Sequence, residues 1–158
     1  MINLNEVQDV LAHISEVQPR YTRKQSGHGI KISSSTDAEK VARAFYQHKD
    51  LQIDYKEYFV AVFLSRANRV LSINIISEGS DCGTVVGIKE MFQIAIMTNA
   101  KGIILCHNHP SGNNKPSQAD LDITKKIKQG GGYFDILLLD HLIISSEAYM
   151  SLANKGNM

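Results

Sequence analysis

Residues 102–120 have the sequence GIILCHNHPSGNNKPSQAD, in which an apolar run is followed by two histidines and a polar loop. The apolar run Ile103–Cys106 is typical of a strand that is buried on both faces of a sheet. Because side chains along a strand alternate with period two, His107 and His109 should point to the same face. Asp120 follows in the next predicted helix and can add a carboxylate. Two imidazoles and one carboxylate form a three-ligand zinc site whose fourth position stays open for water.

The loop after the histidines places these groups at the rim of the sheet. Pro110 cannot donate to a sheet ladder, so the strand should end there, at the edge where open α/β sheets place their sites. Ser117 and Asp120 also form an N-terminal capping pattern, and residues three apart share one face of a helix. Asp120 can therefore both cap the helix and bind metal. Ser117 could likewise have two roles, in the cap and in the site, but its hydroxyl has one proton and can donate to only one acceptor at a time. Cys106 should point to the opposite face, as a buried and inert thiol rather than a fourth ligand.

Length and composition predict one soluble globular domain. The chain has 158 residues, of which 43% are hydrophobic and 21% are charged, and Lys plus Arg number 17 against 16 for Asp plus Glu. This balance does not favour a nucleic-acid or membrane partner. Cys82 and Cys106 do not form a C-x-x-C pair, which excludes a thiolate zinc ribbon, and so few cysteines favour a reducing compartment. No apolar segment reaches about 18 residues and no signal peptide is visible at Met1–Glu6, so we expect a cytoplasmic protein.

Apolar periodicity predicts an α/β fold with a mixed sheet flanked by helices. Helices are expected over residues 5–16, 36–48, 87–99, 117–129 and 147–153, and strands over residues 58–64, 70–76, 102–107, 134–139 and 141–145. The first two strands should form a hairpin, with the first buried on both faces and the second half-exposed. These elements divide the chain into a helical N-terminal extension (residues 1–50) and one mixed α/β domain (residues 51–158).

Local signals predict several element boundaries. Thr36 and Glu39 form a capping box at the start of the second helix, and Gly130–Gly132 should stop the fourth helix at Gln129. The polar residues 19–32 should form a loop. One face of the third helix should be apolar, and it consists of Ile88, Met91, Phe92, Ala95 and Ile96.

The metal-site pattern resembles that of a known family. Two histidines one residue apart, seven further residues, a serine, two residues and an aspartate form the signature of the JAMM metalloprotease domains, also called JAB or MPN-plus. The version here, HNHPSG followed by PSxxD, is similar to the RadC-like branch, and the similarity covers residues 56–151. It implies a cytidine-deaminase-like three-layer α/β/α fold. It also implies one zinc ion per chain, held by His107, His109 and Asp120, and a catalytic glutamate from an upstream strand.

In such domains the glutamate stands just before the first central strand, which favours Glu57 in the sequence KEYFVAV (residues 56–62). Glu78 is the next candidate, and Glu90, within a predicted helix, fits less well. Zinc would lower the pKa of a bound water from about 15.7 to about 7. Glu57 would accept the water proton and return it to the leaving amine, and Ser117 would donate to the oxyanion. The resemblance therefore implies a metallopeptidase or isopeptidase hydrolase whose peptide or isopeptide substrate is unidentified.

Other classes of protein fit less well. Zinc deaminases require H-x-E and P-C-x-x-C, which this sequence lacks, and HNH nucleases spread their residues over a ββα element. The alternative function is a nucleic-acid-binding or scaffold protein, because RadC-type proteins have carried a DNA-repair label. Lys125, Lys126 and Lys128 form only a weak basic patch for such a role. The pair Asp140–His141, between two expected strands, is predicted to be structural rather than catalytic.

Overall fold

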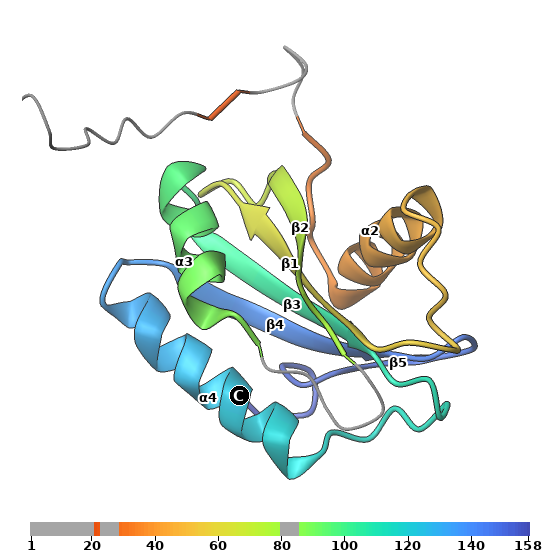
Figure 1. Ribbon diagram of the computed structural model, residues 1–158. Helices are drawn as coiled ribbons and strands as arrows, with labels where there is room; N and C mark the ends of the chain where they lie inside the picture. The colour runs from red at the N-terminus through yellow and green to blue at the C-terminus, as the bar shows by residue number, and fades with distance from the viewer. Residues whose placement is uncertain (1–20, 23–28, 80–85) are drawn as a thin grey trace, which may run out of the picture.

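The computed structural model describes residues 21–22, 29–79 and 86–158, which form a sheet between two helical layers (Figure 1). The elements are, in chain order, α2 (Ser35–His48), β1 (Tyr58–Leu64), β2 (Val70–Glu78), α3 (Ile88–Met97), β3 (Gly102–Asn108), α4 (Gln118–Gly132), β4 (Leu137–Ile144) and β5 (Tyr149–Ser151). Helix α2 covers one face of the sheet, and α3 and α4 cover the other. The predicted mixed sheet flanked by helices is confirmed. The helix expected over residues 5–16 and most of the loop expected over 19–32 lie outside the described residues.

The sheet has the strand order β2-β1-β3-β4-β5. Strand β1 pairs antiparallel with β2 and β3, and β4 pairs antiparallel with β5, whereas β3 and β4 are parallel. A parallel pair needs a crossover connection, which α4 supplies here. The loop of residues 109–117 therefore connects the end of β3 to the start of α4 at one rim of the sheet.

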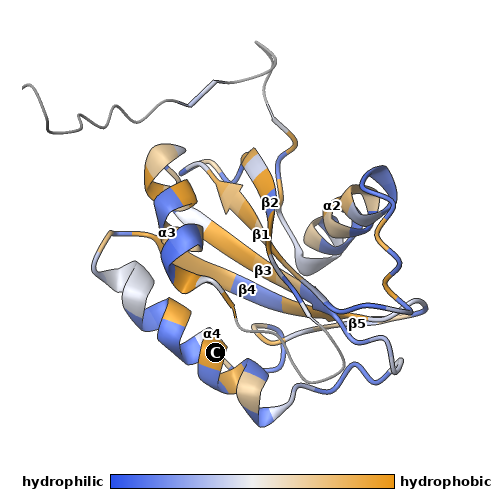
Figure 2. Ribbon diagram, in the orientation of Figure 1, coloured by the Kyte–Doolittle hydropathy of each residue, from blue (hydrophilic) through white to orange (hydrophobic). Residues whose placement is uncertain are grey.

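Burial on both faces explains the continuous apolar sequence of β1. Val60 and Val62 belong to the core under α2, whereas Ala61 and Phe63 belong to the core under α3. Strand β2 lies at the edge of the sheet and is only partly buried, as predicted. Its antiparallel pairing with β1 confirms the predicted hairpin, although β2 extends further than expected, to Glu78. In Figure 2, β1 and β3 are largely hydrophobic, whereas α2 and α4 carry many hydrophilic residues.

Helix α2 packs directly on the sheet through Ala38, Ala42 and Tyr46. Part of the N-terminal extension expected over residues 1–50 therefore shares a core with the strands, and the division of the chain at residue 50 stays a prediction. Of the helices within the described residues, none has the length and apolar content to cross a membrane.

Helix α4 does not stop at Gln129 as predicted, but continues through Gly130–Gly132. The chain folds back onto the helix end, where the Ile136 amide donates to the Gly131 carbonyl at 2.9 Å. A Cβ atom on Gly131 would lie 2.3 Å from the Ile136 carbonyl oxygen. The glycine here permits a close approach of two backbones rather than ending the helix.

Two predictions about the C-terminal third are wrong. Residues 134–145 contain one strand, β4, instead of two, with a register shift at Leu139 that keeps the polar pair Asp140–His141 inside the sheet. The helix expected over residues 147–153 is absent from this segment, because Tyr149–Ser151 pairs with the outer edge of β4. The hydrogen bonds offered by that edge decide the conformation of so short a segment.

Two details of the other helices also differ from the prediction. The N-cap of α2 is Ser34 rather than Thr36, because the Ser34 hydroxyl accepts a hydrogen bond from the Asp37 amide at 3.1 Å. Ile96 of α3 is 53% exposed, since the neighbouring Ala95 is the residue that faces the sheet.

We predict that Gly131→Ala lowers the free energy of unfolding by about 1–3 kcal/mol, because the added methyl group would overlap the Ile136 carbonyl. Gly132→Ala is the matched control, since a Cβ there meets nothing within 4 Å. Alanine at this second position should stabilise the helix by about 0.5–1 kcal/mol. Urea unfolding monitored by circular dichroism measures both changes, and equal stability of the two variants would contradict the close approach.

Candidate metal centre

The three predicted ligands converge at the rim where β3 ends and α4 begins. His107 is the penultimate residue of β3, His109 follows the strand, and Asp120 lies in the first turn of α4. The Nε2 atoms of His107 and His109 are 2.8 Å apart. The Asp120 carboxylate oxygens lie 3.2 Å from His107 Nε2 and 3.5 Å from His109 Nε2. The three side chains could therefore hold one metal ion.

The proton positions around His109 test whether the cluster suits a cation. His109 Nδ1 lies 2.5 Å from the Asn113 carbonyl oxygen, and a carbonyl only accepts, so Nδ1 carries a proton. In the neutral ring, Nε2 is then an acceptor that faces the acceptor oxygens of Asp120. Two acceptors at this distance are stable only with a proton or a cation between them. Nitrogen and oxygen ligands of this kind fit zinc.

Ionisation of these groups follows from the same contacts. Burial opposes the ionisation of Asp120, but the close contacts with the His107 and His109 rings outweigh it and hold the pKa of the carboxyl well below its usual range. The contact with the Asp120 carboxylate in turn raises the pKa of His109, against an opposing effect of burial. Asp120 is therefore a carboxylate at neutral pH, which is the form that binds metal.

Ser117 is the N-cap of α4, and the predicted capping pattern is confirmed as a capping box. Its Oγ accepts from the Asp120 amide at 3.2 Å and donates to Asp120 Oδ2 at 2.7 Å. The Ser117 amide also donates to Oδ2, at 2.6 Å. The single hydroxyl proton is therefore held by Asp120, and Ser117 must rotate to donate to any other acceptor.

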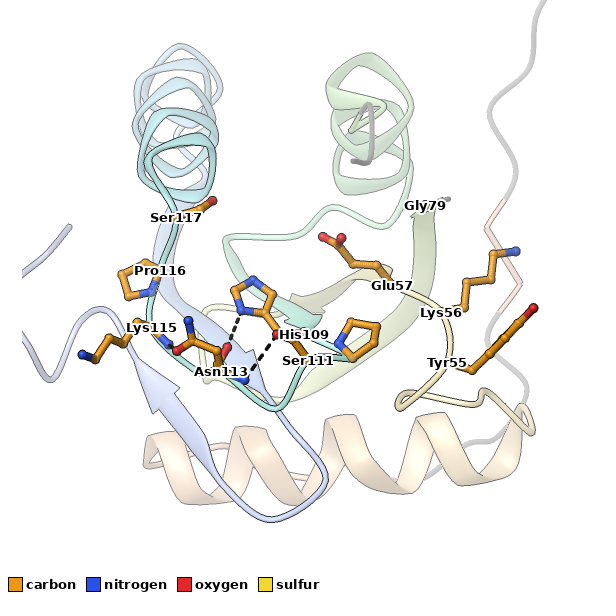
Figure 3. A pocket seen from close by; sticks show the side chains of 11 residues that line it. Tyr55, Lys56, Glu57, Gly79, His109, Ser111, Asn113, Lys115, Pro116 and Ser117 are labelled. Carbon is orange, nitrogen blue, oxygen red and sulfur yellow. Dashed lines mark hydrogen bonds between the residues drawn. The ribbon is translucent and has the colours of Figure 1, made fainter. Parts of the chain in front are cut away.

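An open cavity of about 860 Å³ lies beside the candidate ligands, and we call it the rim cavity. Glu57 and Ser117 lie on either side of the His109 ring, and both side chains point into the rim cavity (Figure 3). Glu78, the second candidate for the catalytic glutamate, is instead paired with Lys56 at 2.6 Å. Glu90 lies on α3, where its carboxylate stands beside Gly87. The placement of Glu57 agrees with the role predicted for it, which remains a prediction.

Cys106 lies on the opposite face of β3 from the histidines, as predicted. Its side chain is fully buried in the core under α2. Burial, with a smaller contribution from the charge of Asp140, raises the pKa of this thiol well above its usual value. Cys106 is therefore a protonated core residue and not a ligand.

Asn108 is a residue of this site that the sequence analysis missed. It is fully buried, and its Nδ2 donates to the carbonyl oxygens of Ile53 and Lys56 at 2.6 and 2.7 Å. Its Oδ1 accepts from the Tyr58 amide at 2.8 Å. These bonds hold the backbone on both sides of Glu57 against the end of β3. The available signal was a polar amide close to the end of a strand expected to be buried, because such a group needs partners.

His141 of β4 contacts His107, one of the candidate ligands. Its Nε2 lies 2.9 Å from His107 Nδ1, so His141 is the buried hydrogen-bond partner of the His107 ring. Burial lowers the pKa of His141 well below its usual value, so the ring is neutral. Asp140 points elsewhere and accepts from the Ser151 hydroxyl at 2.7 Å and the Ala153 amide at 3.1 Å.

A mixed sheet between helices, with two histidines and an aspartate at its rim, defines a JAB-type domain. The chain belongs to the RadC-like JAB domain family, whose model matches residues 32–157. It is 41% identical over 126 residues to a UPF0758 protein of Flavobacterium johnsoniae, covering 80% of this chain and 53% of the relative. A UPF0758 protein of Geobacillus sp. strain WCH70 is 36% identical over 155 residues, covering 98% of this chain and 66% of the relative. The chain thus spans about half to two thirds of these relatives, whose names specify no activity.

We predict that Asn108→Ala lowers the free energy of unfolding by about 1–3 kcal/mol, because it leaves buried backbone groups without hydrogen-bond partners. Hydrogen exchange at the Tyr58 amide should accelerate more than exchange in α4. Asn154→Ala, which removes an exposed amide bonded to Ser35, is the control and should change stability little. Unchanged exchange at Tyr58 in the Asn108 variant would contradict the role of this side chain.

Proposed function

We propose that this domain is a zinc-dependent hydrolase that cleaves peptide or isopeptide bonds. The observation that carries the proposal is the convergence of two imidazole nitrogens and one carboxylate beside an open cavity. This ligand set favours zinc over calcium or magnesium, which prefer oxygen ligands alone. A set of three protein ligands is typical of catalytic zinc sites, whereas structural sites have four.

The side chains around the cavity supply the remaining chemistry. When bound, zinc would supply Lewis acidity, which makes water a nucleophile at neutral pH. Glu57 shares the cavity with His109 and would accept the proton of the attacking water, then return it to the leaving amine nitrogen. Ser117 would donate to the carbonyl oxygen as negative charge develops there. It would exchange its present acceptor, Asp120 Oδ2, for the substrate.

The lining of the rim cavity supports a substrate with an extended backbone. Tyr55, Pro110 and Pro116 contribute apolar walls, while Glu57 and Ser117 contribute polar groups near the ligands. The cavity opens to solvent, which suits a chain that continues beyond the reacting bond. Membership in the JAB superfamily, which includes hydrolases, supports the same reaction class.

The protein should bind about one zinc ion per chain, and His109→Ala should remove it, because two ligands no longer hold the ion tightly. His48→Ala, which alters an exposed histidine at the end of α2, should retain full stoichiometry. Elemental analysis of the dialysed proteins measures the content. Zinc retained by the His109 variant would reject this ligand assignment.

Glu57→Gln should retain zinc but lose about 10²–10⁴-fold in hydrolysis rate, the usual contribution of a general base. Glu78→Gln is the matched control and should keep wild-type activity, because Glu78 pairs with Lys56 instead of lining the cavity. Cleavage of a peptide library, with and without chelator, supplies the readout. Loss of zinc in the Glu57 variant would make this residue a ligand or a folding residue.

The same protein samples distinguish the hydrolase from the alternative function, a nucleic-acid-binding or scaffold protein. A nucleic-acid-binding role would give salt-dependent retention of DNA by both the wild type and His109→Ala, with no chelator-sensitive cleavage. That result would replace the hydrolase proposal.

A further inference from the structure

A buried chain of hydrogen bonds connects α4 to the candidate ligand His107. The Thr124 hydroxyl lies 2.6 Å from His141 Nδ1, and His141 Nε2 lies 2.9 Å from His107 Nδ1. His107 and His141 are fully buried, and Thr124 is 2% exposed. In such a setting each polar atom has a defined role as donor or acceptor, since solvent is not there to replace a missing partner.

The role of each atom follows from the main-chain carbonyl oxygen of Asp120, which can only accept a hydrogen bond. Thr124 Oγ1 donates its proton to the main-chain carbonyl oxygen of Asp120. The hydroxyl can then only accept from His141, so His141 Nδ1 carries a proton and its Nε2 carries a lone pair. His107 Nδ1 must therefore donate to His141 Nε2, and the lone pair of His107 lies on Nε2.

We propose that Thr124, acting through His141, is a positioning residue that fixes the tautomer of His107 so that its Nε2 lone pair faces the metal position. This inference rests on the proposed function in one respect, namely that the cluster binds zinc. His107 Nε2 is the atom that lies 2.8 Å from His109 Nε2 and 3.2 Å from Asp120. With the opposite tautomer, a proton on Nε2 would occupy the place of the ion.

The position of Thr124 on α4 couples two ligands. It lies four residues after Asp120, so its hydroxyl reaches the Asp120 carbonyl one helical turn earlier. The same helix thus presents the Asp120 carboxylate to the metal position and, through Thr124, holds the hydrogen bonds that orient His107. A shift of α4 would move both ligands together.

Thr124→Val tests the inference, because valine keeps the shape of threonine and removes the hydroxyl. It should weaken zinc binding about 10–100-fold, the effect typical of removing a group that orients a metal-bound histidine. Thr124→Ser, which restores the hydroxyl, should return the affinity close to the wild-type value. Thr98→Val is the matched control, since the Thr98 hydroxyl is also buried and also donates to a carbonyl one turn earlier, within α3. Zinc affinity is measured by competition with a chromophoric chelator.

Proton positions are read directly from long-range ¹H–¹⁵N correlation spectra of the imidazole rings in the wild-type protein. Both His107 and His141 should carry their proton on Nδ1. A proton on His141 Nε2, or a Thr124→Val variant that binds zinc as tightly as wild type, would overturn the inference and leave the hydrolase proposal standing. A wild-type protein that binds no zinc would overturn the proposed function, while its spectra would still decide the tautomers.

Discussion

The close approach of electron-rich atoms from β3 and α4 is the constraint on which the rest of the site depends. The Nε2 atoms of His107 and His109 lie 2.8 Å apart, and the Asp120 carboxylate lies 3.2 and 3.5 Å from them. Such a group is stable only when positive charge lies among its members, as a proton or a metal ion. The crossover from β3 through α4 brings the three side chains together, so the topology of the sheet creates the site.

The candidate ligands are held in place by contacts from several elements. The Asn113 carbonyl orients His109, and His141 of β4 contacts His107 from behind. Asn108 ties the segment before β1 to the end of β3, which places Glu57 beside the cavity. Such a supporting shell preorganises a site, because the side chains do not have to be ordered when an ion or substrate binds.

The local part of this site could be predicted from the sequence, and the long-range part could not. Alternation along one strand and a capping pattern depend on near neighbours, which is why the positions of His107, His109 and Asp120 were expected. Asn108 bonds to groups 50 to 55 residues earlier, and His141 reaches His107 across 34 residues. Those contacts depend on which strands pair and in which register, which periodicity does not reveal. The single strand β4 and its pairing with β5 were missed for the same reason.

X-ray absorption spectroscopy at the zinc edge of the zinc-loaded protein tests the central claim most directly. We expect an inner shell of nitrogen and oxygen atoms alone, at about 2.0–2.2 Å, with the outer-shell scattering of two imidazole rings. A sulfur shell at about 2.3 Å, or bound zinc without imidazole scattering, would contradict a centre built from His107, His109 and Asp120.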